Sequence, residues 1–207
     1  MSTIKLYRHP LSGHSHRVEL LLSLLGINAD IIDVDLLQGA HKTPEFLLKN
    51  PAGQVPVLED GDIVLSDSNA ILVYLASKYD ATNTWLPTTS YEAAEVQKCL
   101  TAAAGPIAFG PAAARLVNVF GAGLDHEKAK ETAHGILRTL DDHLASRNWM
   151  VGFTPTVADV ANYAYIAHAP EGDVALDNYP NVRSWLRRIE TLPGFVPMQA
   201  TPVGLAA

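Results

Sequence analysis

The residues best suited to hold a ligand lie in the stretch 50–70. Asp67 and Ser68 stand at the expected start of a helix, where unpaired backbone amides and the positive end of the helix dipole favour a carboxylate. Val55 precedes Pro56, and a cis bond between them is one way to leave the Val55 backbone free to pair with another chain. This hairpin therefore predicts two backbone docking points for a small peptide.

Cysteine usage and charge narrow the chemistry. Cys99 is the only cysteine of the 207 residues, which excludes an intramolecular disulfide, a CxxC redox pair and a thiolate zinc cluster. Any thiol chemistry must therefore use the sulfur of a ligand. The formal net charge of -7, without a basic block, argues against nucleic acid or an anionic membrane as the main partner.

The ends and the hydropathy pattern indicate a cytoplasmic protein. No uninterrupted apolar run approaches the length needed to span a bilayer. The first ten residues also lack the charged start and apolar core of a secretion signal. We therefore expect no membrane association.

The elements that position the hairpin follow a strand–helix–strand pattern. A parallel βαβ unit is expected first, then a short helix, two strands and a further helix, with a proline at the start of the third strand. The expected segments are Ile4–Tyr7, a helix carrying Val18 to Leu25, Ile31–Val34, Thr43–Leu48, Val55–Leu58, Ile63–Leu65 and Asp67–Lys78. The order βαβαββα is the thioredoxin-like plan, so we expect an α/β thioredoxin-like domain over 1–80.

The second half of the chain reads as helical. Residues 81–90 are polar and rich in turn formers, which indicates a linker before an all-α domain over 91–207. The helices expected there are 91–104, 112–120, a helix within 124–147, 157–168 and 182–192. Gly105-Pro106 and Gly110-Pro111 should separate or kink the first two. Thr156 and Asp159 have capping-box spacing and should serve folding.

Three segments together resemble the cytosolic glutathione transferases of the bacterial type. They cover nearly the whole chain and occur in the family's order and spacing: LYRHPLSGHSHRVELLLSLLG, HKTPEFLLKNPAGQVPVLEDGDIVLSDSNAILVYLASKY, and TVADVANYAY with YPNVRSWLRRIETLPGF. The resemblance implies a thioredoxin-like domain followed by a helical domain, in agreement with the pattern above. It also implies attack of the glutathione sulfur on an electrophile, with glutathione as co-substrate. No metal is predicted, because the residues offer no complete set of metal ligands.

Ser12 is the candidate catalytic residue. It matches the family's serine in the pattern S-x-x-S-x-R-V, between the first strand and a helix that begins near Ser15. Its hydroxyl can donate to the sulfur, and the helix dipole adds to the field that favours thiolate. Taken alone, a serine at this position is far more often a helix cap than a catalyst, and the match over the rest of the chain reverses that expectation. Ser15, three residues on, is the rival donor.

The resemblance also implies how glutathione is held. The Val55 backbone, beside Pro56, should pair with the cysteinyl part of the peptide. Asp67 and Ser68 match the family's acidic–serine pair for the γ-glutamyl end. The glycyl end is assigned to two side chains, Gln54 and His41, with Lys42 as a possible charge partner.

Topology suggests a pocket for a small hydrophobic electrophile between the domains. We expect Pro10 and Leu11 on one side of it and residues around Phe109, Pro111 and Arg115 on the other. Conjugation is the leading function. A peroxidase, isomerase or dehalogenase on the same fold stays open, as does a glutathione-binding module without catalysis. The resemblance implies a homodimer.

Three neighbouring residues of the first helix receive structural interpretations. Arg17 resembles the family's helix arginine and is interpreted as structural. His14 and His16 have no further ligand at a spacing that would close a metal site, which favours a surface or pocket-lining role.

Overall fold

The N-terminal third of the chain is a four-stranded mixed sheet. The computed structural model describes residues 4–206. The strands β1 (Ile4–Arg8), β2 (Ala29–Asp33), β3 (Val57–Asp60) and β4 (Ile63–Ser66) lie in the order β2-β1-β3-β4. β1 is parallel to β2 and antiparallel to β3, which is antiparallel to β4. The sequence-based prediction of a βαβαββα thioredoxin-like domain is confirmed.

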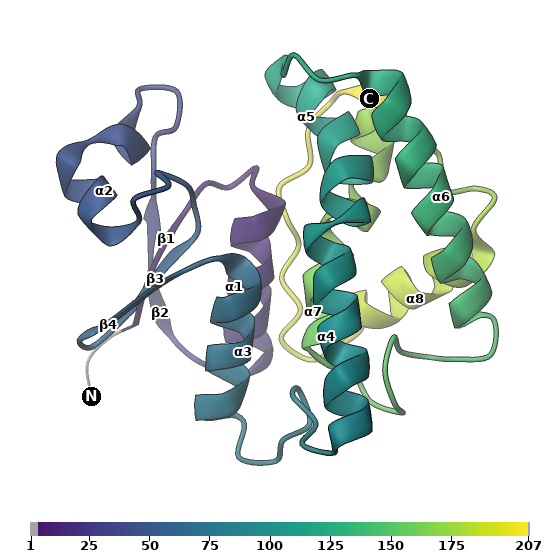
Figure 1. The fold of residues 1–207 in the computed structure, drawn as a ribbon, viewed down its shortest axis with the longest axis horizontal. Coiled ribbons are helices and arrows are strands. Elements are labelled where there is room, and N and C mark those ends of the chain that lie inside the picture. Colours follow the sequence, from purple (N-terminus) through teal and green to yellow (C-terminus); the bar gives the residue numbers. More distant parts are fainter. Residues whose placement is uncertain (1–3, 207) are drawn as a thin grey trace.

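Helices cover both faces of this sheet. α1 (Gly13–Leu24) and α3 (Ser68–Tyr79) lie together between the sheet and the helical half of the molecule, and α2 (Pro44–Lys49) lies away from that half (Figure 1). Leu6 and Leu58 of the sheet and Leu21 and Leu72 of the helices are fully buried. Burying such apolar side chains is the main source of stability here, and it fixes the loops at the strand ends.

The rest of the chain is helical, as predicted. Its regular helices are α4 (Ser90–Ala104), α5 (Ala113–Phe120), α6 (His126–Leu144), α7 (Val157–Ala167) and α8 (Pro180–Glu190). A wide π-helical turn, Ala108–Ala112, joins α4 to α5, so the expected break at Gly110-Pro111 is a change of helical pitch. A π turn accommodates Pro111, which has no amide to donate to a regular helical hydrogen bond.

By its length and mean hydropathy, the helical stretch Ser90–Phe120 could cross a bilayer. It contains no uninterrupted apolar run of that length. Half of its most apolar window is buried inside the helical half of the molecule. This burial is typical of a core helix, because part of its apolar surface, including Val96, Leu100 and Ala103, is covered by the rest of the fold.

Asp159 is the polar centre of the helical half. Its carboxylate is buried and accepts from the backbone amides of Met150 and Thr156 at 3.0 and 2.9 Å and from the indole of Trp185 at 2.8 Å. The predicted capping box with Thr156 is present. The carboxylate thus ties the start of α7 to α8 and to the loop before α7. All residues from Val157 to Ile166 are buried.

The two halves touch where α1 meets α7. A Cβ atom on Gly13 would stand 2.7 Å from the ring of Tyr165, so only glycine permits this approach. The C-terminal segment also runs past this junction before it ends beside α5 (Figure 1). His16 of α1 holds that segment by donating from Nε2 to the carbonyl of Val196 at 2.8 Å. The start of α1 is therefore positioned by both halves of the chain.

Candidate active site

A cavity of about 560 Å³ opens between the two halves. One wall comes from the β1–α1 loop and the loops that precede α2 and β3, and the other from the π turn, α5 and α7. The described residues that line it are His9, Leu11, Ser12, His14, Leu36, His41, Lys42, Gly53, Gln54, Val55, Ala108, Ala112, Arg115, Leu116, Phe120 and Tyr165. Its size is typical of small-molecule sites.

Ser12 stands at the N-terminus of α1 and faces this cavity. It is the helix N-cap, with extended backbone angles, and its Oγ accepts from the Ser15 amide at 3.2 Å. That bond uses a lone pair and leaves the hydroxyl proton available to a ligand. The neighbouring amides and the helix dipole favour an anion at the same place.

Ser15 lies in a different environment. Its side chain is fully buried, and its Oγ accepts from the His9 amide at 3.3 Å. It is not among the residues that line the cavity. The bond holds the β1–α1 loop, and the cavity is reached by the Ser12 hydroxyl instead.

The Val55-Pro56 peptide bond is cis, as the sequence suggested. Pro56 is buried, while Gln54 is exposed at the cavity mouth and its carbonyl accepts from the Asn50 amide group at 2.8 Å. Within residues 4–206, no hydrogen bond engages the amide or carbonyl of Val55. This backbone is therefore available to pair with an extended peptide.

His41 and Lys42 lie at the same end of the cavity as Gln54. Lys42 donates from Nζ to the carbonyls of Ala52 and Gly53 at 3.3 and 3.1 Å, which holds its charge beside the loop. The His41 Nδ1 atom is buried and has no partner among the described residues. Both side chains can meet the carboxylate at one end of a peptide.

Asp67 and Ser68 line a smaller cavity of about 120 Å³ that shares His14, Gln54 and Val55 with the first. Asp67 caps α3 by accepting from the Ala70 amide at 2.9 Å, in a backbone conformation with φ 72° that non-glycine residues rarely adopt. Ser68 is the first residue of that helix, so its hydroxyl and the free backbone amides of the first turn lie together at the helix N-terminus beside this cavity.

Arg17 is a buried cation directly behind Ser68. It donates from Nη1 to the Ser68 Oγ at 3.1 Å and to His14 Nδ1 at 2.8 Å, and its guanidinium lies over the Tyr165 ring at 5.5 Å. Its Nε has no partner among residues 4–206. Burial lowers the pKa of Arg17 to about 10, which still leaves it charged at neutral pH. Its structural interpretation holds, and its charge also favours an anion at Ser68.

The proton of His14 is placed by its neighbour. Because a guanidinium can only donate, His14 Nδ1 must accept from Arg17, and the ring carries its proton on Nε2. Burial, and then the charge of Arg17, lower the pKa of His14 to about 3. His14 is therefore a neutral N–H donor that lines both cavities, in agreement with the interpretation from the sequence. For His16 that interpretation was wrong, because the side chain is buried and lines neither of these cavities.

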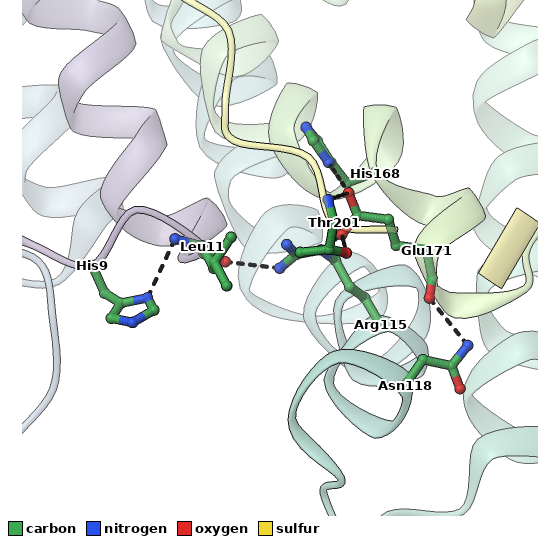
Figure 2. Close-up of polar contacts among 7 residues, drawn as sticks. All are labelled: His9, Leu11, Arg115, Asn118, His168, Glu171 and Thr201. Carbon is green, nitrogen blue, oxygen red and sulfur yellow. Dashed lines mark hydrogen bonds and ion pairs between the residues drawn. The ribbon is translucent and has the colours of Figure 1, made fainter. Parts of the chain in front are cut away.

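Leu11 and Arg115 reach the cavity, as expected from the sequence, whereas Pro10 and Phe109 do not. Phe109 is 70% exposed, because consecutive residues of a helical turn face different directions and the inward face here carries Ala108. Pro111 is buried in the π turn and is not among the residues that line the cavity. Arg115 is buried and donates from Nη1 to the Leu11 carbonyl at 2.8 Å, so α5 holds the loop before Ser12 (Figure 2).

Glu171 neutralises Arg115 from the other side. Its Oε2 accepts from Arg115 Nε at 2.6 Å and from the Thr201 hydroxyl at 2.7 Å, and its Oε1 accepts from His168 Nδ1 at 2.6 Å (Figure 2). Burial raises the pKa of Glu171, but the bonds from His168, Thr201 and Arg115 outweigh it and the pKa is lowered. The carboxylate is ionised and fixes the guanidinium.

Among the lining residues that the sequence analysis did not name, two carry polar rings. His9 ends up beside Ser12, and its ring packs edge-on against Phe120 of α5 at 6.2 Å between centroids. Tyr165 comes from α7, far along the chain. Nothing in the sequence distinguishes either from a packing residue, because both contacts depend on how the two halves dock.

Features elsewhere do not compete with this site. A cavity of about 680 Å³ at the start of α4 contains none of the predicted residues. Burial raises the pKa of Cys99 to about 11, so its thiol is protonated at neutral pH. Within residues 4–206, no group of three His, Cys, Asp or Glu side chains lies close enough together to hold a metal ion.

Comparisons with known proteins match both halves of the chain. Residues 2–77 match the family model "Glutathione S-transferase, N-terminal domain" and residues 113–193 match "Glutathione S-transferase, C-terminal domain". Glutathione S-transferase 3 of Zea mays is 34% identical over 206 residues, covering 94% of this chain and 92% of that protein.

Solved structures are also similar. A possible glutathione S-transferase from Rhodopseudomonas palustris has a TM-score of 0.87 at 34% identity, covering 97% of this chain and 100% of that one. A glutathione transferase homologue from Drosophila mojavensis, with bound glutathione, has a TM-score of 0.85 at 26% identity, covering 93% and 90%.

Proposed function

This chain belongs to the glutathione S-transferase family and is an enzyme that uses glutathione as co-substrate, and on that premise we propose that Ser12 is the residue that activates the thiol. The observation that carries the proposal is the geometry of Ser12. Its hydroxyl caps α1, faces the cavity and keeps its proton free to donate. A hydroxyl donor at a helix N-terminus stabilises a thiolate, which is the reactive form of the nucleophile.

Glutathione would lie across the two connected cavities. The Val55 amide and carbonyl, beside Pro56, pair with the cysteinyl residue, which directs the sulfur to Ser12. The γ-glutamyl carboxylate meets the Ser68 hydroxyl and the α3 amides, with Asp67 near the amine and Arg17 behind. The glycyl carboxylate meets the side chains of His41, Lys42 and Gln54.

The reaction then needs little from the protein beyond the thiolate. The thiol releases its proton to solvent, the Ser12 hydroxyl and the helix dipole hold the negative sulfur, and the sulfur attacks a small hydrophobic electrophile. The electrophile occupies the apolar end of the cavity, where Leu11, Ala112 and Phe120 exclude water. We assign 1–80 to glutathione binding, 81–90 to the linker and 91–207 to the electrophile side.

The wider setting is proposed from the family. A homodimer in the cytoplasm is typical of these enzymes, and such a dimer would pack the first domain of one subunit on the helical domain of the other. Sedimentation at micromolar concentration measures this directly, and a monomer at that concentration would contradict it.

Calorimetric titration of glutathione, followed by the pH dependence of thiolate absorbance in the complex, tests the function. We expect saturable binding and a bound thiol pKa clearly below the free value of about 8.5. Binding with an unchanged thiol pKa would contradict the activation by Ser12. No binding at millimolar glutathione would contradict the glutathione site itself.

A further inference from the structure

His9 lies in the cavity with its proton in a fixed place. Its Nδ1 is 3.2 Å from the backbone nitrogen of Leu11 (Figure 2). A backbone amide is only a donor, so Nδ1 must accept and the neutral ring carries its proton on Nε2. The same Leu11 peptide segment is held from the other side by Arg115, which fixes the position of the imidazole.

The ring is kept neutral and in one orientation. Burial lowers the pKa of His9, Asp33 and Asp35 raise it, and Arg8 and Arg115 lower it further, with a net shift below 6.5. Phe120 packs against one side of the ring. The Nε2–H group makes no hydrogen bond with any residue in 4–206 and is therefore free to meet a ligand.

The surroundings select the kind of ligand. The described cavity lining contains no aspartate or glutamate, so no carboxylate of the lining competes with a ligand for the Nε2–H of His9. Arg115 Nη2 is buried and also has no partner among residues 4–206. The remaining lining near His9 is apolar and is made of Leu11, Ala108, Ala112, Leu116 and Phe120. An electrophile that fits must combine an apolar body with a hydrogen-bond acceptor.

We propose that His9 is a catalytic residue for acceptors of the α,β-unsaturated carbonyl class, and that its Nε2–H binds the carbonyl oxygen of the electrophile. This inference rests on the proposed function, since it needs the thiolate at Ser12. It explains why a polar, neutral ring stands at the apolar end of the pocket.

The step balances without another reagent. The sulfur lone pair forms the new bond to the β-carbon, the carbon–carbon π electrons shift toward the carbonyl, and the oxygen becomes an enolate. His9 keeps its proton and stabilises that oxygen by a hydrogen bond that strengthens as charge develops. The α-carbon then takes a proton from water, which replaces the one the thiol released.

Two substrates with the same phenyl group distinguish stabilisation of the carbonyl oxygen by His9 from a general loss of activity. Cinnamaldehyde develops charge on oxygen, whereas benzyl chloride loses chloride and develops none on a carbonyl. For His9→Leu we expect kcat/KM to fall about tenfold with cinnamaldehyde and to stay within about twofold with benzyl chloride, as for the loss of one hydrogen bond to developing charge.

His9→Gln is the rescue variant. Its amide oxygen can accept from Leu11 while its NH2 group donates to the substrate, so we expect it to restore most of the cinnamaldehyde rate. Benzyl chloride turnover by each variant reports whether the fold and the thiolate are intact. An equal loss with both substrates, or no loss with cinnamaldehyde, would overturn the role of His9. A wild-type complex whose bound thiol has an ordinary pKa would overturn the proposed function instead.

Discussion

Replacing Ser12 with alanine should raise the pKa of the bound thiol and leave binding nearly intact. Among residues 4–206 the hydroxyl makes one hydrogen bond, which it accepts from the Ser15 amide at 3.2 Å, and its proton is free for the sulfur. The variant thus removes one hydrogen bond to a charged group, worth about 1.5–3 kcal/mol. At about 1.4 kcal/mol per unit, the thiol pKa should rise by about 1–2 units.

The effect on rate follows from the thiolate fraction. If the wild-type site lowers the thiol pKa to about 6.5, about 75% is thiolate at pH 7, against about 3% for an unperturbed thiol near 8.5. Ser12→Ala should therefore lose about 3- to 25-fold in kcat at pH 7. The loss should shrink as pH rises, because above both pKa values the two enzymes hold equal thiolate.

Thiolate absorbance titrations of the two complexes and pH–rate profiles measure this shift. Thr89→Ala is the matched control, because it removes an N-cap on α4 outside the cavity and costs a comparable amount of stability, about 1 kcal/mol. Ser15→Ala tests the rival donor. The assignment of Ser12 as the thiol donor would be refuted if the Ser12→Ala enzyme kept the wild-type pKa of the bound thiol. It would also be refuted if Ser15→Ala raised that pKa.

Three further predictions concern buried polar groups. Asp159→Ala should cost about 3–5 kcal/mol in urea unfolding, since four bonds to its carboxylate are lost inside the core. Arg115→Met should cost a similar amount, because it leaves the buried Glu171 carboxylate without its guanidinium partner. The double variant Arg115→Met with Glu171→Met should cost less than the sum of the two single variants. The third prediction concerns His16, whose pKa burial lowers to about 4 in the folded protein. The unfolded chain takes up this proton near pH 6.5 and the folded chain only near pH 4, so the free energy of unfolding should fall as the pH drops between these values. The slope is up to about 1.4 kcal/mol per pH unit for this one proton. His16→Gln should flatten that part of the stability curve.

Each of these has its own contrary result. Loss of an exposed helix cap such as Thr89 costs about 1 kcal/mol. If Asp159→Ala costs no more than that, the hydrogen bonds to its carboxylate do not stabilise the helical half as we infer. Additive costs for Arg115 and Glu171 would deny their coupling. An unchanged acid limb for His16→Gln would assign the acid sensitivity to other groups.

The parts of the site that the sequence predicted are those set by local structure. Ser12 and Asp67 are helix caps, and a cap is recognisable from a few neighbouring residues. The Val55-Pro56 turn is equally local. These positions depend on their own strand or helix, so pattern and resemblance were enough to find them.

The parts that the sequence could not predict depend on docking between the halves. His9 and Tyr165 reach the cavity only because α5 and α7 pack beside the β1–α1 loop. Phe109 failed as a pocket residue because the inward face of the π turn is not set by apolar periodicity, and Ala108 and Ala112 occupy it. The proton positions of His9 and His14 follow from hydrogen bonds with the nearby Leu11 amide and Arg17 guanidinium, and these bonds depend on side-chain orientations that the sequence pattern does not show.

The contacts across the junction also bear on how such a chain can be recombined. Gly13 with Tyr165, and the Leu11 carbonyl with Arg115, join residues that lie roughly a hundred or more positions apart, and both pairs set the loop that carries Ser12. A hybrid that takes its first third from one relative and the remainder from another inherits one member of each pair from each parent. Such a hybrid can fold in both parts and still hold its serine out of place, unless the two pairs are transferred together.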